Sequence, residues 1–146
     1  MKSVLLIGIA LLVSAPGLSA AAAPDGPSGL ACFENLSAPE FPPAALSANI
    51  DGSVWTTVQV SPQGTVEKIE TQVVSAWSKA AGLLVPPVEK VIRAARVNPQ
   101  CAGKTVSVVF RYAINGDPTP SPTPTSRTLG TNTMWIESRP AGKPQV

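Results

Sequence analysis

The side chains with the clearest potential chemistry are two cysteines, Cys32 and Cys101. In an oxidising compartment two cysteines usually join, and this bridge would close a loop of about 70 residues, worth on the order of 4 kcal/mol in the chain-entropy model. A redox pair is the alternative, but the chain lacks both a Cys-x-x-Cys spacing and any histidine. The pattern therefore favours a structural disulfide between an N-terminal arm and a segment that follows a predicted helix.

Catalysis has little support in the residue types. The absence of histidine removes the commonest general base and the commonest metal ligand. Serines and threonines are plentiful, but none has a histidine base, and no two carboxylates show the spacing of an acid/base pair. Two cysteines cannot supply a four-cysteine zinc site. We predict no enzyme activity, no catalytic residues, no cofactor and no metal site.

The charge pattern argues against a nucleic-acid partner. The net charge is +2 and only 14% of the residues are charged, so the dense basic patch of a nucleic-acid surface is missing. Lys90, Arg93 and Arg96 lie off the apolar stripe of the predicted helix. We interpret them as its solvated face in preference to an anion site, and we expect no small-molecule substrate.

Residues 1–23 have the pattern of a signal peptide. A basic start at Lys2 precedes an apolar run, residues 4–13, and cleavage is predicted between Ala20 and Ala23. The alternative is an uncleaved membrane anchor, because Leu18 and the following alanines could lengthen the apolar span. In both cases the remainder is exported, to the periplasm or beyond the cell, where a disulfide is permitted.

A hairpin is predicted at residues 54–74. Apolar or β-branched side chains occupy every second position from Val54 to Val60, which is the period of a half-buried strand. Residues 61–64, Ser-Pro-Gln-Gly, supply a turn, and a second strand runs from Thr65 towards Val74. Val66 and Ile69 are out of phase, so we expect a bulge between them.

One helix and a third strand complete the predicted domain. After Pro86-Pro87 an apolar stripe recurs at helical spacing, and Asn98-Pro99 ends it; its members are Val88, Val91, Ile92 and Ala95. Residues 105–114 then alternate as a strand. The predicted fold class is α+β: a small β-β-α-β domain, with a three-stranded antiparallel sheet and one helix packed on a face. Such a sheet has two open edges.

Both ends of the mature chain are expected to be loose. Residues 24–38 form a flexible arm that carries Cys32, and residues 117–146 form a flexible tail rich in proline, threonine and serine. Within the tail, Met134-Trp135-Ile136 is an isolated apolar cluster that docks on the domain, docks on a partner, or does neither. Trp55 points away from the valines of its strand, and we favour packing over exposure for binding.

Residues 39–116 resemble the C-terminal domain of the TonB energy-transducer family. The resemblance lies in an ordered set of positions: Phe41, Pro42, Gly52, Gly64, Arg96, Pro99 and the closing run 110–116. Ala95 and Val97 stand where the family usually has aromatic residues. Family transducers also carry a membrane helix and a long spacer, whereas a short signal peptide leads almost directly into the domain here. We therefore expect that this chain does not transmit force alone.

The resemblance implies a non-catalytic module that binds by strand addition. Family members hold a short peptide from an outer-membrane receptor against a sheet edge, and backbone hydrogen bonds supply the affinity. The third strand would offer that edge for a receptor or another envelope protein, through Thr105, Ser107, Val109, Arg111 and Ala113. The alternative is an edge already covered by the tail or by a second copy of the chain, in a structural or self-associating envelope protein.

Overall fold

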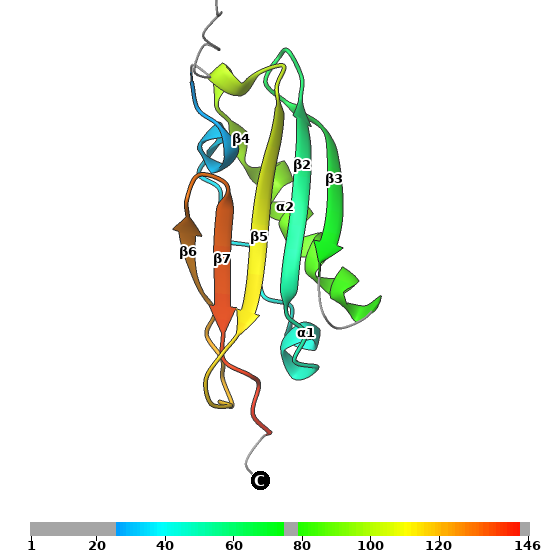
Figure 1. Cartoon of the computed structure of the whole chain (residues 1–146), viewed down its shortest axis with the longest axis vertical. Helices are drawn as coiled ribbons and strands as arrows, with labels where there is room; N and C mark the ends of the chain where they lie inside the picture. Colours follow the sequence, from blue (N-terminus) through cyan, green and yellow to red (C-terminus); the bar gives the residue numbers. More distant parts are fainter. Residues whose placement is uncertain (1–25, 75–78, 144–146) are drawn as a thin grey trace, which may run out of the picture.

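The computed structural model describes residues 26–74 and 79–143 (Figure 1), so the predicted signal segment lies outside the described residues. Its centre is a five-stranded sheet with the order β3-β2-β5-β7-β6. The strands are β2 (Gly52–Val60), β3 (Val66–Val74), β5 (Thr105–Ile114), β6 (Thr125–Leu129) and β7 (Thr133–Ser138). All neighbours are antiparallel except β5 and β7, which run parallel. The α+β class is confirmed, and the expectation of exactly three strands is wrong.

Several short elements surround the sheet. They are η1 (Gly29–Cys32), β1 (Phe33–Glu34), α1 (Pro43–Ser47), η2 (Lys79–Leu84), α2 (Val85–Ala94), β4 (Arg96–Val97) and η3 (Pro99–Cys101). β1 pairs with β4, with Phe33 opposite Val97. The arm that we expected to be flexible therefore holds ordered structure from Gly29 to Glu34. Both Cys32 and Phe33 are buried, which explains why this part of the arm is fixed.

The hairpin of β2 and β3 follows the sequence prediction. The register shifts between Gln59, which faces Lys68, and Val60, which faces Val66. This shift is the predicted bulge. Gly64 has φ +83° and its N–H donates to the carbonyl oxygen of Ser61, so glycine is needed where the turn adopts a left-handed conformation.

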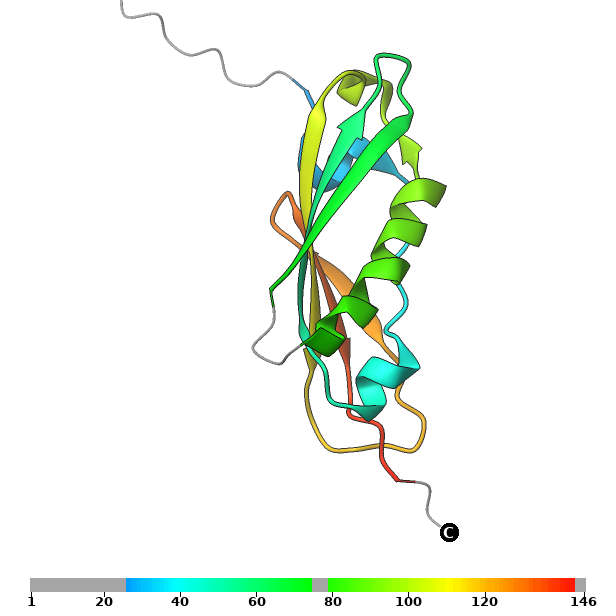
Figure 2. The ribbon, with the colours of Figure 1, turned by 90° about the vertical axis from the view of Figure 1, so that its right-hand side faces the viewer.

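The helix α2 crosses one face of the sheet (Figure 2). Val88 and Ile92 are fully buried, as the apolar stripe predicts, and prolines occupy its first turn. The helix ends at Ala94, four residues before Asn98, because Arg96 and Val97 leave it to pair with β1. The core lies between α2 and the sheet, where Val54, Phe110 and Tyr112 have no exposed surface.

The two additional strands come from the segment that we expected to be a flexible tail. Met134, Ile136 and Ser138 alternate inward and are buried, so β7 completes the core at this side of the sheet. Residues 130–132 form the connecting turn, with Gly130 at φ +64°. The prolines at 118–124 precede the hairpin and do not interrupt it. Docking of Met134-Trp135-Ile136 on the domain is thus the observed outcome.

Candidate functional site

The edge of β5 is the position where strand addition was expected. In an antiparallel pair, the backbone groups of alternate residues point to opposite neighbours. Val60 N–H donates to the carbonyl oxygen of Lys104, which shows that even-numbered residues face β2. The odd-numbered residues of β5 therefore present their N–H and C=O groups to the other side, and these are the residues predicted to bind a partner.

β7 occupies most of this edge. The backbone N–H of Val109 donates to the carbonyl oxygen of Asn132 at 2.7 Å. The backbone N–H of Asn115 donates to the carbonyl oxygen of Ser138 at 2.9 Å. Between these two bonds β7 pairs with β5 from Val109 to Ile114. The expectation of an exposed edge is therefore wrong for Val109, Arg111 and Ala113. A partner role for these residues stays a prediction that requires β7 to leave.

Thr105 and Ser107 are not paired with β7, because the pairing of β5 and β7 begins at Val109. Together with the arm and the turn before β7, they line a pocket of about 460 Å³, which also includes Lys104, Cys32 and Asn132. Within the part of the chain that the structure describes, no backbone hydrogen bond fills this stretch of the β5 edge. A short section of the predicted edge is thus still accessible.

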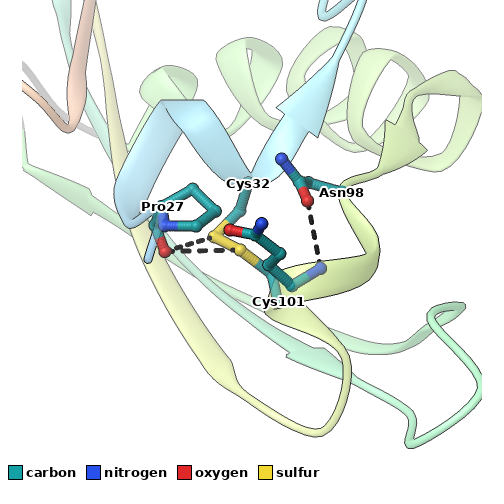
Figure 3. The surroundings of a disulfide bond; sticks show 5 residues. Pro27, Cys32, Asn98 and Cys101 are labelled. Carbon is teal, nitrogen blue, oxygen red and sulfur yellow. Dashed lines mark hydrogen bonds between the residues drawn. A yellow bond between two sulfur atoms is a disulfide. The ribbon is translucent and has the colours of Figure 1, made fainter. Parts of the chain in front are cut away.

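The disulfide fixes the arm beside this pocket (Figure 3). Cys32 and Cys101 are joined, as the sequence suggested, with 5.7 Å between their Cα atoms. The carbonyl oxygen of Pro27 lies 3.5 Å and 3.4 Å from the two sulfur atoms, a contact without a hydrogen bond because neither sulfur carries a proton. The backbone N–H of Asn98 donates to the carbonyl oxygen of Cys32, and its side-chain Oδ1 accepts from the backbone N–H of Gln100, so the arm and η3 are held together.

The structure also places the other positions that carry the family resemblance. Phe41 is buried edge-on against Tyr112, with 5.1 Å between ring centroids and an interplanar angle of 83°. Pro42 precedes α1, Gly52 begins β2, and Pro99 begins η3. Arg96 is exposed on β4, and beside it Arg93 and Gly64 line a shallow pocket. Gly64 serves the hairpin turn, as described above.

Two strands form the outer edges of the sheet. β3 carries Glu67, Lys68 and Glu70, and the last two form an ion pair. Charges of this kind are a common protection of an edge against pairing. β6 has one charged side chain, that of Arg127, and all five of its residues are exposed. Of the two outer edges, β6 is the less protected.

The described residues give no sign of two other kinds of site. None of their helices has the length and apolar character of a membrane span. Nowhere in residues 26–74 and 79–143 do three or more potential metal-ligating side chains gather.

A family model described as the C-terminal region of the Gram-negative bacterial TonB protein matches residues 37–115, just over half of the chain. The chain belongs to the TonB C-terminal family. The matched part is therefore a TonB-like module of the type found in the Gram-negative envelope. No curated protein matches the chain. The match ends at Asn115, so the TonB-like part stops with β5, and the β6–β7 hairpin lies outside it.

Sequence reasoning missed the residues of this hairpin. Ser126 and Thr128 on β6 were assigned to a flexible tail, and Trp135 on β7 was noted only as part of an apolar cluster whose docking was left open. A local signal was present, because two β-rich runs flank Gly130-Thr131-Asn132, a hairpin loop with glycine. The proline-rich composition that precedes the runs concealed it.

Proposed function

We propose that this chain is a non-catalytic periplasmic binding module, linked to TonB-dependent transport, that captures an extended peptide segment by strand addition. The segment would come from an outer-membrane receptor or another envelope protein. Support comes from family membership and from one structural observation: β6 is an exposed edge strand with little protection.

The backbone of β6 is oriented for strand addition. β7 directs the backbone groups of its even-numbered residues to β5, so its odd-numbered residues pair with β6. Thr125, Arg127 and Leu129 face these odd residues, which leaves the N–H and C=O groups of Ser126 and Thr128 pointing outward. Capture there displaces no buried side chain, whereas capture at Val109–Ile114 would remove Met134 and Ile136 from the core.

Selectivity would come from a pocket of about 220 Å³ beside the start of β6. Ser126, Pro124, Pro39, Phe41 and Ile136 are among its lining residues. Alternate side chains of an added strand point to the same face of the sheet, so one of them would enter this pocket. An apolar side chain of moderate size fits this lining.

A second candidate is a structural envelope protein that keeps the fold without capturing peptide. The observation in its favour is the self-covered edge, since β7 fills the position on β5 where the family resemblance places a peptide. This candidate predicts an inert β6 and protected amides along β5.

An amide NMR titration separates the two candidates. The mature chain would be titrated with short peptides from the plug N-termini of outer-membrane receptors. We expect saturable shifts at Ser126 and Thr128. Shifts at Thr105, Ser107 and Val109, with loss of the β7 pairing, would instead place capture at β5. Absence of any shift would favour the structural candidate.

Thr128→Pro provides the matched variant. Proline removes the outward N–H, and it is tolerated on an edge strand whose N–H faces solvent. We expect most of the peptide-induced shift to disappear in Thr128→Pro and to persist in Thr128→Ala. Equal shifts in both variants would contradict capture at β6.

A further inference from the structure

Among residues 26–74 and 79–143, the helices leave one face of the sheet uncovered. In Figure 2 the described helices lie on one side of the sheet, and none of them lies on the opposite side. Trp55 lies on this open face, because its strand neighbours Val54 and Thr56 are buried on the other side. The register then assigns the same face to Arg111 on β5, Trp135 on β7 and Arg127 on β6.

Two arginines flank one tryptophan at the centre of this face. Arg111 and Arg127 both lie directly opposite Trp135, from the strands on either side of it. Their guanidinium carbons are 5.9 Å and 5.6 Å from the ring centroid. Each contact is a cation–π interaction, which restricts the arginine side chain before any ligand arrives. The two cationic groups are therefore held in place on the surface.

The acidic side chains of the open face already have partners. Glu70 is paired with Lys68, and Glu137 accepts from the indole N–H of Trp135 and from the side-chain Nδ2 of Asn115. Arg111 donates to the hydroxyl of Ser53, but among the described side chains neither arginine forms an ion pair with a carboxylate. Both guanidinium groups can thus bind an external anion, for which their planar donors suit carboxylates.

Trp55 adds an exposed aromatic surface to the same face, since 55% of it is accessible. From β2 to β6 the face spans three strand spacings, about 14 Å, so a ligand that contacts Trp55 and Arg127 is elongated. On this face Val109 lies directly opposite Trp55 and Val74 is its diagonal neighbour, whereas exposed Leu129 on β6 is separated from them by polar positions. The apolar area around Trp55 is thus small and bounded by Ser53, Thr57 and Arg111, which is less than acyl chains or the dry core of a protein interface require.

We propose that the open face binds an anionic glycan strand. Trp55 stacks on a sugar ring, and Arg111 and Arg127 bind carboxylates carried by the strand. Polar groups on the same face, on Thr57, Gln72 and Thr133, can bind sugar hydroxyls around these three side chains. This site is on a face of the sheet and does not depend on strand addition at an edge.

Co-sedimentation with purified peptidoglycan sacculi tests the proposal, using the mature full chain. We expect wild type to pellet with the sacculi, and the affinity to fall about tenfold or more in Trp55→Ala and in Arg111→Gln/Arg127→Gln. Arg93→Gln/Arg96→Gln removes two exposed positive charges from α2 and β4 and should leave binding unchanged. In a parallel NMR titration, soluble muropeptides should shift the indole N–H of Trp55.

Several outcomes would overturn the proposal. The first is failure of wild type to pellet with the sacculi. The second is an equal loss of affinity in the Arg111/Arg127 and the Arg93/Arg96 double variants, which would indicate non-specific charge attraction. Lipopolysaccharide vesicles that capture the protein through the same arginines, while sacculi do not, would assign the face to a lipid. A concentration-dependent dimer lost in Trp55→Ala would assign it to a second copy. Each readout is independent of the peptide titration at β6.

Discussion

At the scale of single residues, Tyr112 is the described side chain whose pKa burial shifts clearly. It is the one tyrosine of the chain, and burial raises the pKa of its phenol far above the usual value because the phenolate would lose its hydration. The unfolded chain therefore releases the phenolic proton first, so this contribution to stability is complete below pH about 10 and declines above it. We expect the free energy of unfolding in urea to fall less steeply above that pH in Tyr112→Phe. Phenolate absorbance at the ordinary pKa in the folded protein would contradict this.

The disulfide gives a second prediction at this scale. Cys32 and Cys101 are separated by 69 residues, so their bond strongly restricts the unfolded chain. Cys32→Ala/Cys101→Ala should lower the free energy of unfolding by about 4 kcal/mol. Urea unfolding of the variant, compared with wild type with and without a reductant, measures the loss. The reductant should destabilise wild type alone. An equal loss of stability in the variant would show that the reductant does not act through the Cys32–Cys101 disulfide.

At the scale of elements, residue patterns within short windows predicted the elements that form from local interactions. The β2–β3 hairpin, its bulge and α2 follow from spacing within short windows, and β5 from clean alternation. The edge of β5 could not be predicted in the same way, because its exposure depends on whether a segment beyond residue 124 returns to it. Trp55 illustrates the same limit. Alternation set its face correctly, but we favoured packing. Only the assembled fold shows that none of the described elements covers Trp55.

The alternation of β7 makes a prediction about the hairpin as an element. Ile136 is buried against the core, while Leu129 on β6 is 39% exposed. Ile136→Ala should lower the free energy of unfolding by about 2–5 kcal/mol, because it leaves a cavity, and Leu129→Ala by about 0.5 kcal/mol or less. Hydrogen exchange at the amides of Val109 and Asn115 should accelerate in Ile136→Ala alone. Unchanged exchange would mean that the inward face of β7 does not hold it on β5.

At the scale of the whole molecule, two parts share one sheet. The TonB-like part ends with β5, and the hairpin that follows it supplies the last two strands and part of the core. The hairpin thereby moves the outer edge of the sheet from β5 to β6, which is short and exposed. It also extends the open face, since Trp135 and Arg127 belong to it. Both proposed binding surfaces of this chain therefore depend on a segment outside the family match.

Removal of residues 117–146 tests this dependence. The shortened chain loses the buried side chains of Met134 and Ile136, which should lower the free energy of unfolding by about 3–6 kcal/mol. It also exposes the β5 edge from Val109 to Ile114, and an open, unprotected edge promotes pairing between chains. Analytical ultracentrifugation should show concentration-dependent association of the shortened chain and a monomer for the full one. Adding Val109→Pro removes the edge N–H and should restore the monomer. A shortened chain that stays monomeric and as stable as the full one would show that β7 does not protect the edge.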